Sequence, residues 1–347
     1  MAGFLRPKAE YDFVILGAGH AGLQAGLKAG LLNHTALLLD RGPKYSRSYY
    51  APAMDNIPGF PDGISGHKLL DLQIAQVRRM ARFTDYLTPV NLESVHREGA
   101  HFVTRFERLK ARYSVRSRVL LLALGVVDRI PEVGGKIDAI FPWANFGIVD
   151  FCMICDGHTL PGRSIAVIGW EPLAVRTAVD LGHWGPSSVT LLTHGHPLLA
   201  ESPTAEREEL LLELERHHIP VRESAIVGFD GIKDKRLGVL FEDGHHEIFD
   251  KGFSALPWYS THAEIARQLG ARITPDGYVD SDEDGRVRSA SDGSILPGLY
   301  VAGDQRDGWK QIPEAWASAE RAVIHAWGFY LSEGGSPPDG PGPSPPP

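Results

Sequence analysis

The sequence predicts an α/β protein of two domains, each a parallel β-sheet covered by helices. Short apolar runs typical of buried strands alternate with helix-length segments along the chain. A strand, a turn and a helix follow one another twice, starting near Asp12 and near Ser164. The length of 347 residues, 43% of them apolar, is enough for two hydrophobic cores.

The clearest expected strands are five apolar runs, which span residues 12–16, 35–40, 118–125, 164–169 and 188–193. Residues 1–10 are a polar lead-in. Residues 332–347 form a Pro/Gly-rich tail, which is predicted to be disordered because it holds too little apolar surface to order itself.

Charge and hydropathy argue against several classes of function. A formal net charge of −8 argues against nucleic acid as a partner, since a phosphate backbone is bound by a basic surface. No apolar run reaches the roughly 20 residues of a membrane span, and an apolar signal sequence is lacking, so no membrane contact and a cytoplasmic location are expected. The basic stretch 97–118 is expected to form solvated strands, with a docking face for an acidic protein as the alternative.

Gly17, Gly19 and Gly22 form a GxGxxG pattern between an apolar strand and a helix that is expected to end near Leu32. In a dinucleotide-binding turn the first glycine permits the tight turn, the second lets the backbone approach a pyrophosphate, and the third lets the helix pack on the strand. The following strand ends in Asp40, a candidate acceptor for a ribose hydroxyl. A glycine-rich turn without a ligand is the alternative.

A second candidate binding segment lies near the other end of the chain. An apolar strand ends at Ala302 and is followed by Gly303 and Asp304, before a helix that starts near Pro313 or Glu314. Parallel sheets bind ligands at the carboxyl ends of their strands. We therefore expect the two ends of the chain to build one site.

The chain contains two cysteines, Cys152 and Cys155. Two cysteines in so long a chain exclude a secreted disulfide framework. A CxxC pair can close a disulfide across the first turn of a helix, whose N-terminus lowers the pKa of a thiol. The alternatives are a zinc site, completed by His158 or by His194 and His196, and two buried bystanders.

The order of these motifs resembles that of the low-molecular-weight thioredoxin reductases over residues 11–330. The motifs are, in order, GxGxxG, "NIPGFPDGISGHKLL" (56–70), "LALG" (122–125), CxxC-Asp-Gly (152–157) and "GLYVAGDQRDGWKQ" (298–311). The resemblance implies two Rossmann-like nucleotide-binding domains, the second inserted in the first. The FAD-binding domain would comprise residues 11–127 and 256–331, the insert would comprise residues 128–255 and carry the cysteines, and the protein would be a homodimer.

The same resemblance implies the cofactor and the roles of individual residues. FAD would be held by the glycine loop and Gly303, with Asp40 on the adenosine ribose, Asp304 on the ribityl chain and Gln311 near the flavin. Cys155 would lie against the flavin, Cys152 would close the redox-active disulfide, and Asp156 would donate or accept the proton. The aspartate suits this role if it is partly buried, because burial raises the pKa of a carboxyl group.

The insert departs from the family pattern where NADPH normally binds. Trp170 and Glu171 stand where the second glycine loop needs glycines, so a bulky ring and a negative charge occupy the place of the pyrophosphate. No lysine or arginine occurs between Arg176 and Arg207, where basic side chains should bind the 2′-phosphate. NADPH is therefore not expected as a cofactor, although entry by another route is the alternative.

Two further segments depart from the family by introducing aromatic residues. Tyr49, Tyr50, Trp258 and Tyr259 are expected to pack in a core or an interface, with stacking on the flavin or on a second planar ligand as the alternative. Whether a second FAD binds is left open.

A chain with these features resembles the NADPH-independent branch of the family, which contains ferredoxin-dependent and diflavin-linked disulfide oxidoreductases. The expected activity is an FAD-dependent transfer of electrons between a donor such as ferredoxin and a protein disulfide such as that of thioredoxin, through Cys152 and Cys155. One alternative is a flavin dithiol oxidase that forms disulfides with oxygen as acceptor. Another is a flavin-binding redox sensor without turnover.

Overall fold

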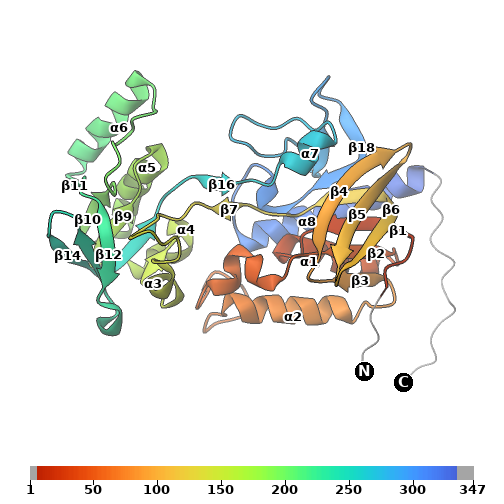
Figure 1. Cartoon of the computed structure of the whole chain (residues 1–347), viewed down its shortest axis with the longest axis horizontal. Coiled ribbons are helices and arrows are strands. Elements are labelled where there is room, and N and C mark those ends of the chain that lie inside the picture. The colour runs from red at the N-terminus through yellow and green to blue at the C-terminus, as the bar shows by residue number, and fades with distance from the viewer. Residues whose placement is uncertain (1–5, 334–347) are drawn as a thin grey trace. The chain divides into compact units, whose positions relative to one another are not determined.

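The computed structural model describes residues 6–333, which fold into two compact units (Figure 1). Within that range the first unit contains the residues up to Tyr49, His67–Val127 and the residues from Ser260 on. The second unit contains Tyr50–Gly66 and Asp128–Tyr259. Where the chain passes from one unit to the other, β7 (Val127–Asp128) and β16 (Trp258–Ser260) pair with each other.

The first unit is built on an eight-stranded sheet, in the order β17-β18-β6-β1-β2-β3, with β5 paired to β6 and β4 paired to β5. The strands are β1 (Glu10–Leu16), β2 (Ala36–Leu39), β3 (Thr84–Leu87), β4 (Asn91–Glu98), β5 (His101–Arg108), β6 (Ala111–Leu122), β17 (Arg286–Arg288) and β18 (Ile295–Val301). Leu16 pairs with both Leu39 and Leu122, and Leu122 pairs with Val301, all in parallel. Four strands therefore end at one edge of the sheet.

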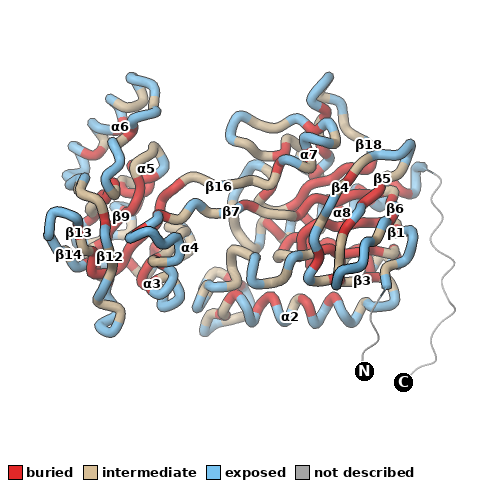
Figure 2. The backbone as a smooth tube through the Cα atoms, viewed as in Figure 1, coloured by how far each residue is buried: buried red, intermediate tan, exposed pale blue. Residues whose placement is uncertain are grey.

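Helices and an antiparallel layer cover the two faces of this sheet. Helices α1 (His20–Leu31), α2 (Gly66–Arg78) and α8 (Ile312–Ser332) contribute to the hydrophobic core on one face. Strands β4 and β5 and helix α7 (Glu264–Gln268) contribute to the core on the other face. Figure 2 shows that the central strands are buried along most of their length. Because both faces are covered, these strands are nearly continuous apolar runs.

The second unit is built on a five-stranded parallel sheet, in the order β11-β10-β9-β15-β8. Its strands are β8 (Val149–Asp150), β9 (Ser164–Ile168), β10 (Ser188–Leu192), β11 (Val221–Arg222) and β15 (Lys251–Ser254). Helices α5 (Pro172–Leu181) and α6 (Thr204–Arg216) pack against one face of the sheet. An antiparallel sheet of β12 (Ile226–Asp230), β13 (Leu237–Phe241) and β14 (His246–Phe249) and the short helix α3 (Phe141–Asn145) pack against the other.

The predicted α/β class with Rossmann-like sheets is confirmed, with two differences in the bounds of elements. Strand β6 begins at Ala111, earlier than expected, because its polar first half pairs antiparallel with β5. The predicted start of the tail at Ser332 is wrong, since Ser332 is the last residue of α8 and Glu333 is its C-cap. The rest of the predicted tail, 334–347, lies outside the described residues.

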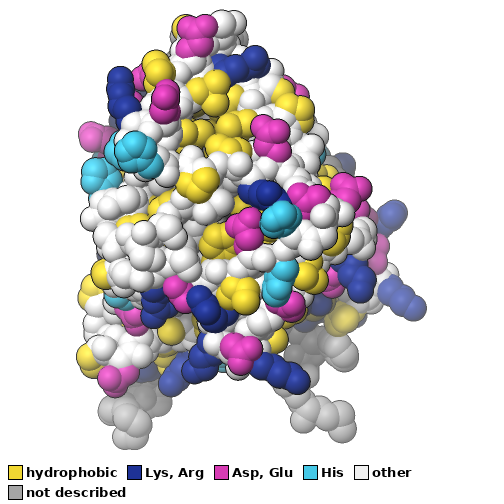
Figure 3. Space-filling model, turned by 90° about the vertical axis from the view of Figure 1, so that its left-hand side faces the viewer, with side chains coloured by type: hydrophobic (Ala, Val, Ile, Leu, Met, Phe, Trp, Pro, Cys, Tyr) yellow, Lys and Arg dark blue, Asp and Glu magenta, His cyan; other side chains and the backbone are white. Residues whose placement is uncertain are grey.

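The expected domain boundaries remain a prediction, because the compact units are defined by contacts and not by a ligand. Residues 50–66, expected in the FAD-binding domain, belong by contact to the second unit. Within the described residues, no helix is both long and apolar enough to cross a membrane. On the face drawn in Figure 3, acidic and basic side chains are interspersed.

Candidate redox site

The turn between β1 and α1 brings the three glycines of the first motif together. Gly17 has a φ of +93°, which favours glycine, and a Cβ there would lie 2.3 Å from the carbonyl oxygen of Ala123. A Cβ on Gly22 would lie 1.8 Å from the carbonyl oxygen of Gly17. A Cβ on Gly19 would meet only the Ser46 hydroxyl, at 3.8 Å. Two glycines are thus required by packing, whereas Gly19 has room for a side-chain atom at ordinary contact distance.

The N-terminus of α1 is suited to bind an anion. Gly19 is its N-cap and makes no side-chain capping bond, and no acidic residue lies in the first turn. Backbone N–H groups of the first turn are therefore available to a phosphate, and the helix dipole favours its negative charge. His20 is buried beside this turn, with its ring nitrogens 2.5 Å from Gln73 Oε1 and 2.6 Å from Ser48 Oγ. Burial lowers the pKa of His20.

Asp40 follows the last residue of β2 at the same edge of the sheet. Its Oδ2 accepts a hydrogen bond from Ala18 N at 2.8 Å, and its Oδ1 accepts one from Gly42 N at 2.5 Å. These bonds fix the carboxylate beside the glycine turn. The structure therefore brings Asp40 and the glycine loop together, as expected for a ribose acceptor next to a pyrophosphate site.

Gly303 and Asp304 follow β18 at this edge, in a 3₁₀ turn (Gly303–Gln305). Gly303 lies close to α1, since a Cβ on it would be 2.8 Å from Ala21 Cβ. Asp304 Oδ2 accepts a hydrogen bond from Arg47 Nη1 at 2.9 Å, an ion pair that the sequence analysis missed. Gln311 is the N-cap of α8.

Taken together, these residues fit FAD: an open glycine turn, an uncapped helix N-terminus and two carboxylates lie at the ends of parallel strands. The family expectation places Asp304 on the ribityl chain, but one of its oxygens is already engaged by Arg47.

In the second unit, Cys152 and Cys155 are joined by a disulfide bond. Cys152 is the N-cap of α4 (Met153–Asp156), a single helical turn that follows β8. The backbone N–H of Cys155 lies 3.2 Å from the carbonyl oxygen of Cys152, so the turn itself brings the two sulfurs close. The two sulfurs are bonded to each other, so in this state neither is a thiolate ligand for the zinc ion that the sequence analysis weighed as an alternative. Within residues 6–333 there is no group of three His, Cys, Asp or Glu side chains that could hold a metal ion.

Asp156, the last residue of this turn, is poised to exchange a proton near neutral pH. Burial and the negative charge of Asp150 raise its pKa to about 7, against smaller opposing effects of Lys251 and His158. A carboxyl group with such a pKa is present in both protonation states at pH 7. His158 Nε2 lies 3.2 Å from Asp55 Oδ2, so this histidine contacts a carboxylate from residues 50–66.

A pair of residues missed by the sequence analysis lies beneath the CxxC turn. Lys251, on β15, forms an ion pair with Asp150, on β8, and both side chains are almost fully buried. The signal in the sequence that could have pointed to this buried pair is Lys251 itself, a charged residue in the mostly apolar run "FDKGFSALP".

The second glycine-loop position lies between β9 and α5 and is filled by side chains. Trp170 stacks on His196, with ring centroids 3.7 Å apart and planes inclined by 17°. The Arg129 guanidinium lies 5.2 Å from the centroid of the Trp170 ring and pairs with Glu171 at 2.9 Å. Pro172 is the first residue of α5 and removes one N–H donor from its N-terminus.

The turn nevertheless keeps its close packing. A Cβ on Gly169 would lie 2.5 Å from the Ala255 carbonyl oxygen and 2.6 Å from Ala174 Cβ. Burial, His194 and Arg129 lower the pKa of His196, so this ring is neutral at pH 7 and does not replace a basic side chain.

The aromatic residues singled out from the sequence have different surroundings. Tyr49 packs against the core of the first unit, and Tyr50 stacks on Phe141 in the second, with ring centroids 6.3 Å apart. Trp258 is half-buried, whereas Tyr259 is 79% exposed. Tyr49 is therefore packed as expected, whereas Tyr50 makes a ring contact although it is 52% exposed.

Comparison with known proteins identifies the class. A family model for pyridine nucleotide-disulphide oxidoreductases matches residues 11–321, and the chain therefore belongs to this family. Within the class its fold is that of thioredoxin reductase: the enzyme from Streptococcus pyogenes MGAS5005 superposes with a TM-score of 0.75 at 19% identity, over 94% of this chain and 100% of that chain.

Two relatives are similar in sequence. Thioredoxin reductase of Borreliella burgdorferi is 32% identical over 170 residues, which cover 49% of this chain and 49% of the relative. The bifunctional thioredoxin reductase/thioredoxin of Mycobacterium leprae is 24% identical over 331 residues, 94% of this chain and 67% of the relative.

Proposed function

We propose that the protein is an FAD-dependent disulfide oxidoreductase that relays electrons between a donor other than NADPH and a protein disulfide such as that of a thioredoxin. Cys152 and Cys155 cycle between disulfide and dithiol, and Asp156 exchanges the proton. FAD, when bound, supplies two-electron chemistry on one side and single-electron exchange on the other. FAD would be held by the glycine turn, Asp40, Gly303, Asp304 and Gln311.

The observation that carries the exclusion of NADPH is the filled turn of the second unit. The stacked rings of Trp170 and His196 occupy the loop at the carboxyl ends of β9 and β10, where a Rossmann-like sheet binds a pyrophosphate. Arg129 offsets the charge of Glu171, so the block depends mainly on the volume of the Trp170 ring and on the absence of basic side chains from residues 177–206.

A ferredoxin is energetically suited as the donor, and a second flavin is the other candidate. Plant-type ferredoxins have potentials of about −400 mV and thioredoxin-like dithiols about −270 mV, a difference of roughly 130 mV. For two electrons this corresponds to about 6 kcal/mol in favour of disulfide reduction. A cytoplasmic homodimer belongs to the same proposal. Light scattering of the purified protein tests the dimer, and fractionation of cells that express the protein tests the location.

An anaerobic reduction experiment tests the proposal. The purified flavoprotein is mixed with NADPH or with photoreduced ferredoxin, and flavin absorbance is followed at about 450 nm. We expect bleaching by ferredoxin and none by NADPH. Cys152→Ser should still bleach with ferredoxin but should not reduce a thioredoxin disulfide, which separates flavin reduction from disulfide transfer.

Other outcomes assign the protein elsewhere. Rapid bleaching of the flavin by NADPH would contradict the proposal and would indicate an ordinary NADPH-dependent thioredoxin reductase. Oxygen uptake with a small dithiol, without ferredoxin, would instead indicate a dithiol oxidase.

As a matched control, Trp170→Gly combined with His196→Arg should gain affinity for NADPH if the stacked rings are what excludes it.

A further inference from the structure

The charged pair beneath the CxxC turn is buried in the second unit. The side chains of Lys251 and Asp150 are 6% and 11% exposed, and Lys251 Nζ pairs with Asp150 Oδ2. Phe253, two residues after Lys251, pairs with Asp150 across the parallel strands β15 and β8, so the two charged side chains lie on the same face. Burying two opposite charges is a poor route to stability, which suggests another role for the pair.

Hydrogen bonds connect this pair to the redox-active turn. Lys251 Nζ donates to Thr159 Oγ1 at 3.0 Å, and Thr159 Oγ1 donates to the carbonyl oxygen of Asp156 at 2.7 Å. Asp150 lies two residues before Cys152 in the chain. Both members of the pair are thus attached to the segment that holds the disulfide, Asp150 through the backbone and Lys251 through Thr159.

We propose that Lys251 and Asp150 are positioning residues that anchor the CxxC turn to the sheet and set, by their opposing charges, how readily Asp156 binds a proton during the disulfide reaction. This inference rests on the proposed function of Cys152 and Cys155. It assigns no contact with substrate or cofactor to either residue.

The charge balance of the reaction explains why such a pair is useful. Reduction breaks the S–S bond with two electrons from a donor such as a reduced flavin, and one proton from Asp156 converts one sulfur to a thiol while the other stays a thiolate. The turn then carries two new negative charges, on the thiolate and on Asp156, beside that of Asp150. The positive charge of the buried Lys251 ammonium offsets part of this negative charge.

Four charged side chains act on Asp156. Asp150 and Asp55 raise its pKa, whereas Lys251 and His158 lower it, and Arg163 in turn acts on Asp150. Removing Lys251 or Asp150 therefore has effects of opposite sign on Asp156. A purely structural role would not produce such a reversal.

The test is the pH profile of thiol–disulfide exchange between the full-length holoprotein and dithiothreitol. The equilibrium constant is measured from pH 5 to 9 by trapping thiols with a maleimide. In the wild type we expect the plot of this equilibrium constant against pH to show an inflection at about pH 7, because Asp156 is harder to ionise in the reduced turn than in the oxidised one. Asp156→Asn should remove the inflection. Lys251→Met should move the inflection up by about one pH unit and Asp150→Asn should move it down by about one. The double variant should lie between them.

Arg236→Met is the matched control, because it removes a charge from an exposed ion pair with Asp250 in the same unit. It should leave the inflection unchanged.

The inference is overturned if Lys251→Met and Asp150→Asn shift the inflection in the same direction, or if neither shifts it in folded protein. If Lys251→Met does not fold, Asp150→Asn and the double variant still decide. Dithiothreitol replaces the biological electron donor, so this result does not depend on whether ferredoxin or NADPH reduces the flavin.

Discussion

At the scale of single residues, the three glycines of the first motif are needed for different reasons. The backbone oxygens of Ala123 and Gly17 exclude a side chain at Gly17 and Gly22, respectively, whereas Gly19 has room for a side-chain atom at ordinary contact distance. Steric need therefore separates two glycines that build the turn from one that leaves room for a ligand.

A matched pair of substitutions tests this separation. Gly22→Ala should destabilise the protein by about 3 kcal/mol or prevent folding, because the new methyl group overlaps a backbone oxygen. Gly19→Val should fold with nearly wild-type stability but lose at least about tenfold in FAD affinity, the equivalent of 1.4 kcal/mol. Urea unfolding of the apoprotein and flavin titration measure the two effects. Equal loss of stability in both variants would contradict the assignment.

His20 gives the protein a pH-dependent stability. Its folded-state pKa lies below the ordinary value of 6.5, so below that pH the unfolded chain binds more protons than the folded one. The stability contributed by the neutral ring is present above pH 6.5 and is lost as the pH falls through it. The free energy of unfolding should therefore decrease as the pH falls below 6.5.

The measurement compares urea unfolding of flavin-free wild type and His20→Gln at several pH values. Glutamine preserves a polar side chain but does not titrate. The variant should show the shallower pH dependence, and identical slopes would disprove the role of His20.

At the residue level, the sequence predicted which residues lie together where their positions depend on local order. The glycine turn, Asp40 after its strand and the CxxC turn are each defined within about 25 residues, and the structure places them accordingly. Lys251 and Thr159 are 92 residues apart, and Asp55 and His158 are 103 apart. Such pairs depend on tertiary folding, so a sequence pattern does not specify them.

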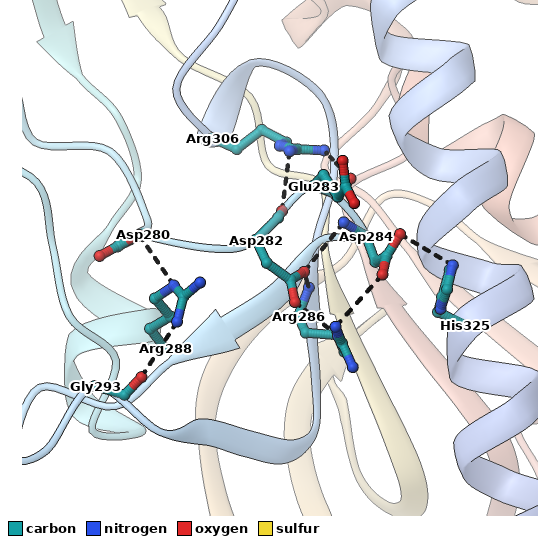
Figure 4. A network of polar contacts seen from close by, with 9 residues as sticks. All are labelled: Asp280, Asp282, Glu283, Asp284, Arg286, Arg288, Gly293, Arg306 and His325. Carbon is teal, nitrogen blue, oxygen red and sulfur yellow. Dashed lines mark hydrogen bonds and ion pairs between the residues drawn. The ribbon is translucent and has the colours of Figure 1, made fainter.

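At the scale of elements, the acidic segment 280–285 in the first unit is held by basic side chains (Figure 4). Arg286 pairs with Asp282 at 2.7 Å and with Asp284 at 3.5 Å, while His325 on α8 lies 3.0 Å from Asp284. Arg306 donates to the carbonyl oxygens of Asp282 and Glu283, at 3.1 and 3.4 Å. The segment is thereby tied to β17, to α8 and to the turn after β18.

Arg306 should contribute most to this segment, because it is half-buried and burial lowers the pKa of its guanidinium. Arg306→Met leaves two backbone carbonyls without their donor and should cost about 1–3 kcal/mol of unfolding free energy. Arg286→Met removes two ion pairs in which the arginine side chain is 45% exposed, whereas those of Asp282 and Asp284 are 13% and 15% exposed. Both carboxylates keep other donors, the backbone N–H groups of Asp284 and Arg286 for Asp282 and the ring of His325 for Asp284, so the cost should be smaller, about 1 kcal/mol. Thermal and urea unfolding of both variants check this order, and the reverse order would refute it.

Elements were predictable where both faces of a strand are buried. The runs that became β1, β2, β9 and β10 are almost wholly apolar, and their bounds agree with the structure to within a few residues. The first half of β6 alternates basic and small residues and was therefore expected only as part of a solvated strand pair. Its partner is β5, and its register comes from that antiparallel pairing.

At the scale of the whole molecule, the second unit is assembled from two stretches of chain. Segment 50–66 contributes Tyr50 to a stack on Phe141 and Asp55 to the ion pair with His158. An insert defined only as residues 128–255 lacks these contacts.

A fragment of residues 128–259 should therefore be less stable alone than when residues 50–66 are joined to it by a flexible linker. We expect the linked segment to raise the Tm by about 4 °C, the shift produced by roughly 1 kcal/mol in a domain of this size. A segment carrying Tyr50→Ala and Asp55→Asn is the control and should restore less of the difference. Equal Tm values for all three fragments would show that the segment does not support the unit.

The steric contrast among the glycines also separates what the fold requires of a nucleotide-binding turn from what a ligand requires of it. In the second unit, Gly169 and Ala174 meet the same packing demand, and Trp170 and Glu171 stand in the interior of the turn. The fold has room for a side chain at the interior position, so a glycine there points to a ligand more strongly than a glycine at either of the other two positions. A motif search that weights the three positions equally therefore scores the packing of the turn as if it were evidence of nucleotide binding.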